Sequence, residues 1–143
     1  MKVYVDADAC PVKDIIISES SKRSIDVIMI CDTSHIINDE YSTVITVDKS
    51  SNSADMVIIN KIEKEDIVVT QDFGLAAVVI SKGAFAINQN GMIYTDENID
   101  GLLFERFLAK KSRNAGKKTK NMSKRTSAND EDFKINYIKL LER

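Results

Sequence analysis

The sequence predicts an α/β fold in which helices cover both faces of a mainly parallel sheet. Short runs of β-branched and other apolar residues recur along the chain, and such runs are typical of strands that are buried on both faces. Segments with a helical spacing of apolar residues separate these runs, and this alternation is typical of parallel sheets with crossover helices. With 143 residues, of which 43% are hydrophobic, the chain is long enough to bury the core of one such domain.

Each expected strand is short and apolar, and most of the strands end at a polar residue. The five runs are 3–5, 27–31, 44–47, 67–70 and 84–88. After the fifth run, the pair Asn90-Gly91 predicts a tight turn. We expect residues 92–94 to follow that turn as a short hairpin arm.

Helices are expected between the strands and after the last of them. They should cover about 11–23, 54–62 and 74–81, with a further helix that begins near 96. Pro11 suits the first position of a helix, because its missing N–H is no loss there. Ser53 is able to cap the second helix, since a serine hydroxyl accepts a hydrogen bond from an unpaired backbone N–H.

Charge divides the chain into three regions. Residues 1–108 carry 9 basic and 18 acidic side chains, residues 109–129 carry 8 basic and none that are acidic, and residues 130–143 carry 3 basic and 4 acidic ones. The net charge of −2 therefore hides an acidic body joined to a basic segment, residues 109–129. We expect residues 1–108 to form the core, the basic segment to be a flexible loop because it holds few apolar residues, and residues 130–143 to form a helix that packs on the core.

Composition excludes several classes of protein. The 5 glycines and 1 proline do not fit a collagen-like or mostly disordered chain, and 2 cysteines are too few for a disulfide scaffold. The start of the chain lacks the pattern of a signal peptide, and no apolar run is long enough to span a bilayer. We therefore expect a cytoplasmic protein that does not bind membranes, and nothing in the sequence indicates an oligomer.

Four carboxylates occupy informative positions. Asp6 and Asp8 follow the first expected strand, Asp72 follows the fourth, and Asp55 lies early in a helix. Ligands of parallel α/β sheets bind outside the carboxyl ends of the strands, so these acids are expected to converge there. Because like charges repel, a bound Mg²⁺ or Mn²⁺ would stabilise them, and such hard cations prefer carboxylate oxygens. The chemistry that such an ion supports is phosphodiester hydrolysis.

Other interpretations of these acids stay open at this point. Each one alone could be a helix cap or a solvated turn residue. A phosphatase of the HAD-like type would use Asp6 as nucleophile and Asp8 as acid, and it would need a lysine near the strand ends. Lys49, Lys61 and Lys64 lie in the middle of the chain, but none of them falls clearly at an expected strand end. A third alternative is an RNA-binding module without catalysis.

The basic segment suggests a polyanionic partner. Lysine and arginine contacts to phosphate provide most of the non-specific affinity for nucleic acid. No aromatic residue interleaves these cations, so base stacking by the segment is not expected, and the alternative is a solvated connector. The candidate phosphate-binding residues are Lys110, Lys111, Arg113, Lys117, Lys118, Lys120, Lys124 and Arg125.

Several motifs resemble those of the YaiI/YqxD family of uncharacterised bacterial proteins (DUF188, UPF0178), which is similar to PIN-like nuclease domains. The quoted motifs are residues 6–12 (DADACPV), 53–55 (SAD), 70–76 (TQDFGLA), Asn88 with Gly91, and the basic stretch 113–124. The resemblance covers nearly the whole chain. It implies a PIN-like three-layer sandwich with an acidic metal site.

The resemblance also implies roles for individual residues. Asp6, Asp55 and Asp72 match the three acids of PIN-like sites. Asn88 stands where such domains carry a fourth acid, and Asp8 is expected to supply the missing carboxylate. Ser53 and Asn88 are then expected to contact the phosphate or a water molecule. Together these features predict a metal-dependent nuclease, with RNA as the expected substrate and Mg²⁺ or Mn²⁺ as the cofactor.

Overall fold

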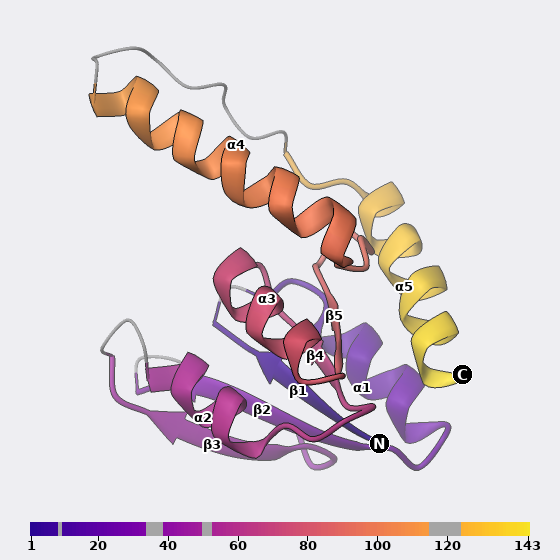
Figure 1. Ribbon diagram of the computed structural model, residues 1–143. Coiled ribbons are helices and arrows are strands. Elements are labelled where there is room, and N and C mark those ends of the chain that lie inside the picture. Colours follow the sequence, from indigo (N-terminus) through magenta and orange to yellow (C-terminus); the bar gives the residue numbers. More distant parts are fainter. Residues whose placement is uncertain (9, 34–38, 50–52, 115–123) are drawn as a thin grey trace.

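A single parallel sheet forms the centre of the molecule (Figure 1). The computed structural model describes residues 1–8, 10–33, 39–49, 53–114 and 124–143. The strand order is β3-β2-β1-β4-β5, and all neighbouring pairs are parallel. The strands are β1 (Lys2–Asp6), β2 (Asp26–Asp32), β3 (Thr43–Val47), β4 (Ile67–Val69) and β5 (Phe85–Ile87). The sheet confirms the α/β fold class.

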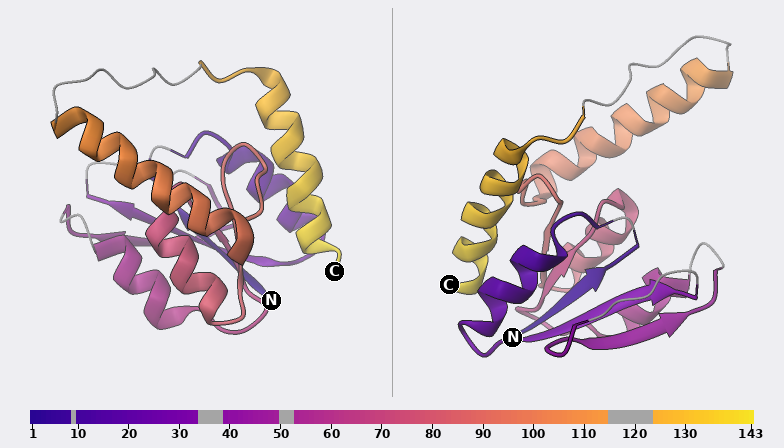
Figure 2. Two further views of the ribbon diagram at one scale, coloured as in Figure 1. Left: turned by 45° about the horizontal axis from the view of Figure 1, so that its top comes forward. Right: turned by 180° about the vertical axis from the view of Figure 1, so that it is seen from behind.

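Helices cover both faces of the sheet, as the two turned views show (Figure 2). Side chains of β1 alternate between the two faces, which is the normal consequence of the pleat. Val3 and Val5 pack in one buried cluster, and Tyr4 belongs to the cluster on the opposite face. The helices are α1 (Lys13–Ser21), α2 (Ser53–Lys61), α3 (Phe73–Ser81), α4 (Asp96–Asn114) and α5 (Ser127–Leu141).

Each face has its own set of helices. Ile16 of α1 and Phe133 of α5 are fully buried with Val3 and Val5. Ile58 of α2 and Val79 of α3 are fully buried in the cluster that contains Tyr4. The result is a three-layer α/β/α arrangement, in which α1 and α5 lie on one side of the sheet and α2, α3 and α4 on the other.

The basic segment differs from the expected loop at both of its ends. Helix α4 continues to Asn114 instead of ending near 108. The residues that extend it include Ala109, Lys110 and Lys111, which are good helix formers, and cations are favourable near a helix C-terminus. Helix α5 begins at Ser127, ahead of the expected residue 130, because Thr126 and Asn129 form a capping box.

The expected hairpin arm is reduced to one antiparallel bridge, between Ile87 and Ile93. The backbone there is held by Asn88, whose Oδ1 accepts hydrogen bonds from the backbone N of Asn90 and of Met92, both at 2.9 Å. A compact turn thus replaces a second strand. Among the described residues, no helix combines the length and the apolar character needed to cross a bilayer.

Candidate functional site

The sheet reverses its direction of winding between β1 and β4. From β1 the chain passes to β2 and β3 on one side, and it then crosses back to β4 and β5 on the other. In sheets of this kind, ligands bind in the crevice outside the carboxyl ends of the strands at the reversal. Asp6 ends β1, and Asp72 follows β4, so both acids flank this crevice.

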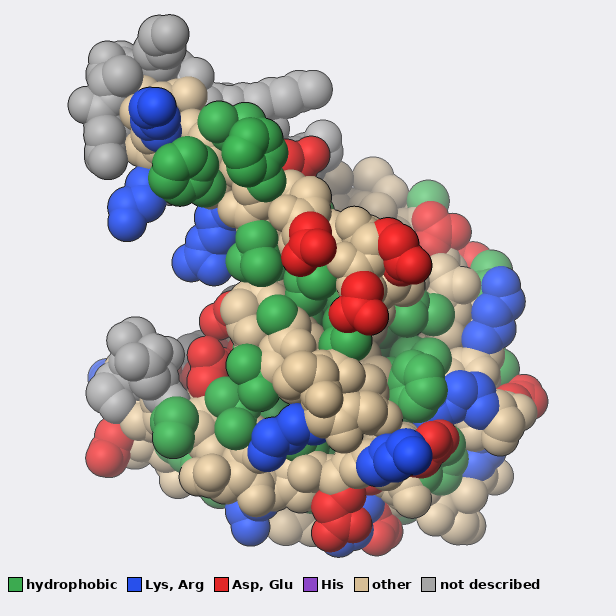
Figure 3. All heavy atoms as spheres, viewed as in Figure 1, with side chains coloured by type: hydrophobic (Ala, Val, Ile, Leu, Met, Phe, Trp, Pro, Cys, Tyr) green, Lys and Arg blue, Asp and Glu red, His purple; other side chains and the backbone are tan. Residues whose placement is uncertain are grey.

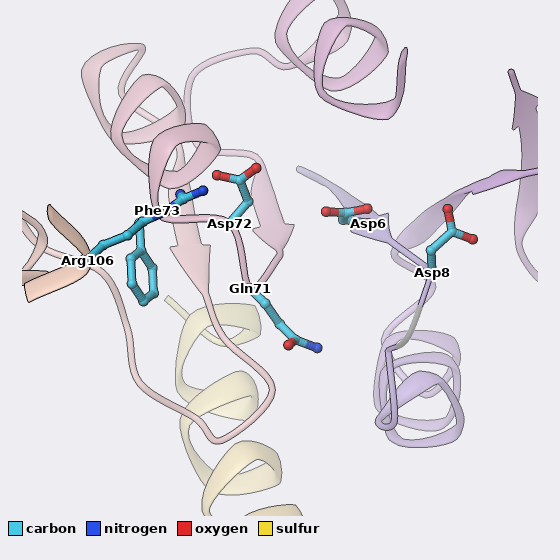
Figure 4. Close-up of a pocket in the computed structure, with 6 residues that line it drawn as sticks. All are labelled: Asp6, Asp8, Gln71, Asp72, Phe73 and Arg106. Atoms are coloured by element: carbon cyan, nitrogen blue, oxygen red, sulfur yellow. The ribbon is translucent and has the colours of Figure 1, made fainter. Parts of the chain in front are cut away.

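Two cavities meet at this edge of the sheet. The larger one, of about 380 Å³, is lined by Asp6, Asp8, Gln71, Asp72, Phe73 and Arg106 (Figure 4). The smaller one, of about 210 Å³, is lined by Asp6, Asp8, Asp32, Val47, Asp48, Lys49, Ala54, Asp55 and Asp72. They share three carboxylates, and we call the two together the acidic cavity. All four acids singled out in the sequence line it, and Figure 3 shows acidic side chains beside a hollow in this part of the surface.

Asp6 is held by the strand next to its own. Val5 pairs with Val69 across β1 and β4, so the residues that follow them are neighbours. The hydroxyl of Thr70 donates a hydrogen bond to Asp6 Oδ2 over 3.1 Å. Burial raises the pKa of Asp6, the hydrogen bond from Thr70 partly lowers it, and the charges of Asp8 and Asp72 raise it again.

Asp72 serves two purposes in the structure. Its Oδ1 caps helix α3 by accepting hydrogen bonds from the backbone N of Gly74 at 2.8 Å and of Leu75 at 3.2 Å. The same side chain lines the acidic cavity. One carboxylate oxygen of Asp72 therefore caps the helix, as the alternative interpretation of this acid expected. The side chain nevertheless also lines the acidic cavity.

Asp55 carries the strongest electrostatic signal in the site. Burial, the charges of Asp72 and Asp6 and a hydrogen bond with Asp72 raise its pKa from 3.8 to about 6. The causes of this shift include two other carboxylates and no cation. Asp72 and Asp6 therefore lie close enough to Asp55 to oppose its ionisation.

Asp8 connects two strand ends. Its Oδ1 and Oδ2 accept hydrogen bonds from the backbone N of Asp32, at 3.2 and 3.1 Å. In Figure 4 its side chain lies beyond Asp6, on the far side from Asp72. Asp8 thus lines the cavity and at the same time fixes the end of β2 relative to the end of β1.

The donor set has the chemistry of a site for a hard divalent cation, because it consists of carboxylate oxygens. Within the described part of the chain, however, no three acidic, histidine or cysteine side chains are grouped as a ready metal site. Asp6, Asp8 and Asp72 accept hydrogen bonds from Thr70, from Asp32 and from the α3 backbone, respectively. The residues fit such an ion by the chemistry of their oxygens and by lining one cavity, but they are not grouped around a single point.

The structure gives Asn88 a different setting from the acids. Both hydrogen bonds to its Oδ1 come from the turn that follows β5, and neither cavity lining includes it. Ser53 is the first residue of α2 and precedes Asp55 by two positions. Contacts of Asn88 and Ser53 with a substrate remain predictions.

The basic residues predicted to bind phosphate lie in different parts of the structure. Lys110 and Lys111 are exposed on α4, and Lys124 is exposed ahead of α5. Arg113 belongs to α4, whereas Lys117, Lys118 and Lys120 lie outside the described residues. These positions leave the predicted contacts with phosphate untested.

Arg125 is engaged in contacts within the fold. Its guanidinium group donates to Asp130 Oδ1 from Nε at 2.9 Å and from Nη2 at 2.6 Å. It also donates to Asn90 Oδ1 and to the carbonyl oxygen of Gln89, both at 2.8 Å. Arg125 thus joins the start of α5 to the turn after β5, which is a structural task that the charge pattern alone did not reveal.

Sequence reasoning missed several residues that line the acidic cavity. Asp32 and Asp48 come at the ends of β2 and β3, so their positions after apolar runs carried the same signal as Asp6. Lys49 follows Asp48 and faces the smaller cavity. Arg106 reaches the larger cavity from α4, and no local pattern in the sequence predicts where that helix passes.

Comparison with known proteins identifies relatives along the whole chain. The UPF0178 protein of Ruminiclostridium cellulolyticum is 59% identical over 133 residues, which are 93% of this chain and 87% of the relative. The UPF0178 protein of Clostridium kluyveri is 48% identical, covering 99% and 93%, and that of Clostridium novyi is 47% identical, covering 100% and 96%. No solved structure matches the chain.

The family model described as "Uncharacterized BCR, YaiI/YqxD family" matches residues 4–143. This match includes the acids that line the cavity, the helical layers on both faces of the sheet, and the basic segment. The resemblance seen in the motifs is therefore confirmed, and the chain belongs to the YaiI/YqxD family, DUF188.

Proposed function

We propose that this protein is a metal-dependent nuclease that hydrolyses phosphodiester bonds in RNA at the acidic cavity. Asp6, Asp55 and Asp72, with Asp8, would hold Mg²⁺ or Mn²⁺. The buried cysteines Cys10 and Cys31 suit a reducing compartment, so we place the activity in the cytoplasm. Burial raises the pKa of the Cys10 thiol, which makes it a poor nucleophile and leaves the carboxylates to carry the chemistry.

The observation that carries the proposal is that Asp6, Asp8, Asp55 and Asp72 all line one cavity. Burial, followed by the charges of Asp72 and Asp6, raises the pKa of Asp55 to about 6. Burial also raises the pKa of Asp6, and the charges of Asp8 and Asp72 add to that shift. Such an arrangement costs free energy in the absence of a cation, and clustered like charges of this kind are common at functional sites. A divalent cation would relieve the repulsion and at the same time attract a phosphate group.

The residues around the cavity have separable tasks in this proposal. When bound, the ion supplies a water molecule of lowered pKa and neutralises charge on the phosphate. Thr70 holds one carboxylate oxygen of Asp6 in place through its hydrogen bond. Asp72 ties the site to the N-terminus of α3, whose positive dipole end favours negative charge in its neighbourhood.

Cleavage of a labelled RNA oligonucleotide tests the proposal. We expect cleavage with Mn²⁺ or Mg²⁺ and none with EDTA, and we expect D6N and D72N to lower the rate more than about 100-fold. D26N is the matched control, because Asp26 begins β2 at the opposite edge of the sheet and is exposed. Equal cleavage by D6N and D26N would contradict the proposed site.

Proton release provides a second readout that does not depend on activity. Metal binding requires ionised carboxylates and therefore releases protons. At a pH near 6, where Asp55 is about half protonated, Mn²⁺ should release a proton from the wild-type protein and less from D55N. Titration calorimetry in buffers of different ionisation enthalpy measures this release, and no binding of Mn²⁺ would refute the metal site.

One observation favours a second candidate, a phosphatase with Asp6 as nucleophile. Such an enzyme needs a lysine near the phosphorylated aspartate, and Lys49 lines the smaller cavity with Asp6 and Asp8. The carboxylate would attack phosphorus, the alcohol would leave, and water would then cleave the aspartyl phosphate. Beryllium fluoride, which imitates the phosphoryl group, should raise the thermal stability of the protein only in this case.

A further inference from the structure

Residues 103–112 of α4, which we call the α4 arm, expose an unusual number of large apolar side chains. The exposed fractions are 38% for Leu103, 60% for Phe104, 59% for Phe107 and 44% for Leu108. Leu103 and Phe107 are four residues apart, as are Phe104 and Leu108, so the four side chains form two adjacent rows on one side of the helix. Grouped apolar exposure of this kind marks an interaction site.

The arm does not take part in the core of the domain. At the start of α4, Ile99 is buried and Leu102 packs against the same apolar cluster. Beyond that point the helix extends away from the body, as Figures 1 and 2 show. The two phenyl rings are therefore presented to the outside by a helix whose first turns are anchored.

Cations accompany the rings along the arm. Arg106, Lys110 and Lys111 are exposed, and Lys111 follows Phe107 by one helical turn in the same row. An apolar partner helix on this side would have to bury the ammonium group of Lys111, which is costly without a paired charge. A strand of nucleic acid offers a phosphate for that group and flat bases for the rings. Proteins that bind single strands combine these two features.

The arm leads directly to the acidic cavity. Arg106 lines that cavity together with Asp6, Asp8 and Asp72, and in Figure 4 it extends toward the cavity from the side opposite Asp8. Figure 3 shows the same relation on the surface, where Lys and Arg side chains of the arm overhang a hollow with acidic side chains on its other wall. A strand on the arm would therefore bring a phosphate to the carboxylates.

We propose that the α4 arm binds single-stranded RNA. Phe104 and Phe107 stack on unpaired bases, Lys110 and Lys111 contact the backbone, and Arg106 positions a phosphate at the acidic cavity. This inference rests on the proposed nuclease function, and it specifies the substrate as a strand without base pairs. We choose RNA as the ligand, because its loops and ends offer unpaired bases to aromatic side chains.

Fluorescence anisotropy with a labelled single-stranded RNA of about ten nucleotides tests the arm, in EDTA so that nothing is cleaved. The variant F104A/F107A should raise the Kd at least tenfold, since stacking contributes about 1–3 kcal/mol per base. F107L, which keeps an apolar side chain without a ring, should also weaken binding. I135A is the matched control, because Ile135 is 46% exposed on α5, and its Kd should equal that of the wild type.

The charged side chains have their own readout. K110Q/K111Q should reduce the slope of log K against log salt concentration by about 1.4, since each phosphate contact to a single strand contributes about 0.7. R106Q should lower the rate of cleavage more than it weakens binding, because Arg106 lies at the cavity. A rate for R106Q equal to that of the wild type would overturn its positioning role.

The experimental outcomes distinguish failure of the proposed RNA binding by the α4 arm from failure of the proposed nuclease function. If F104A/F107A weakens RNA binding and neither the wild type nor any variant cleaves RNA, the arm is supported and the nuclease function is refuted. If the wild type cleaves RNA and F104A/F107A leaves both Kd and rate unchanged, the arm is refuted. Equal affinity for an RNA duplex or for single-stranded DNA would overturn the choice of single-stranded RNA. A dimer in light scattering that F104A/F107A dissociates would assign the arm to a second copy instead.

Discussion

The hydroxyl group of Thr70 donates a hydrogen bond to Asp6 Oδ2 over 3.1 Å, and Thr70 Oγ1 accepts one from the backbone N of Asp72 over 3.0 Å. Thr70 is only 2% exposed, and this short chain of hydrogen bonds is partly buried. It connects the ends of β1 and β4, where the sheet reverses its winding. The orientation of Asp6 at the acidic cavity therefore depends on one buried hydroxyl group.

Replacing this hydroxyl should affect both stability and the site. T70V keeps the shape of the side chain and removes both hydrogen bonds, which should cost about 1–3 kcal/mol. The pKa of Asp6 should rise further, because the hydrogen bond from Thr70 lowers it in the wild type. Urea unfolding measures the first effect, and a titration of Asp6 followed by NMR measures the second.

T70S is the control for this prediction, since serine keeps the hydroxyl group and loses only a methyl group. Its Asp6 pKa should stay close to that of the wild type, and the proposed RNA cleavage should be retained. If T70V and T70S shift the pKa of Asp6 equally, the hydrogen bond does not control this carboxylate.

The positions of the acids at the strand ends could be predicted, because the sequence pattern shows where each strand ends. Short β-branched runs such as Ile67–Val69 give a strand, and the polar residue after it must lie at the carboxyl end of the sheet. In a parallel sheet these ends share one edge, and the pairing of β1 with β4 brings Asp6 and Asp72 near each other. Asp55 joined them because α2 begins at the same edge after β3.

The contribution of α4 was not predictable in the same way. Whether Arg106 reaches the cavity depends on the packing of α4 against α3, which involves residues far from any motif. The partners of Arg125 lie more than thirty residues away at Gln89 and Asn90, and a run of cations gives no information about such contacts. Local sequence patterns therefore located the acids, whereas the contacts of Arg106 and Arg125 depend on long-range packing.

The raised pKa of Asp55 predicts how the stability of the metal-free protein changes with pH. The folded chain has a pKa of about 6 at this residue, against an ordinary value of 3.8. Between these pH values the folded protein holds a proton that the unfolded chain has lost, so stability falls as the pH rises from about 4 to about 6. D55N should therefore stabilise the metal-free protein at pH 7, and thermal unfolding at a series of pH values measures this.

The control for Asp55 is D14N, because Asp14 is an exposed acid in the first turn of another helix, α1. D14N should not gain stability at pH 7. Addition of Mn²⁺ should raise the unfolding temperature of the wild type more than that of D55N, since the proposed ion would use this carboxylate. A D55N protein that is less stable than the wild type at pH 7 would contradict the repulsion inferred among the acids.

Arg125 should contribute to stability through its contacts and not through its charge alone. R125K keeps the charge but cannot reach Asp130, Asn90 and the Gln89 carbonyl oxygen at once. We expect a loss of about 1–2 kcal/mol in urea unfolding. K124Q removes a charge at the neighbouring exposed position and should change stability by less than about 0.5 kcal/mol. A larger effect for K124Q than for R125K would show that net charge, and not the arginine contacts, stabilises this junction.

Gly91 is the residue that brings the turn after β5 against α5. Its φ of +90° is rarely adopted by other residues, and a Cβ there would lie 2.5 Å from the carbonyl oxygen of Asp132. Because that neighbour is helix backbone, it cannot move aside easily, and G91A should lose about 2–4 kcal/mol. G101A is the matched control, since Gly101 lies within α4 with nothing within 4 Å of the added methyl group. Alanine favours the helix there and should add about 0.5–1 kcal/mol. Urea unfolding midpoints that shift in opposite directions for the two variants are the expected result, and equal midpoints would mean that the turn does not contact α5 this closely.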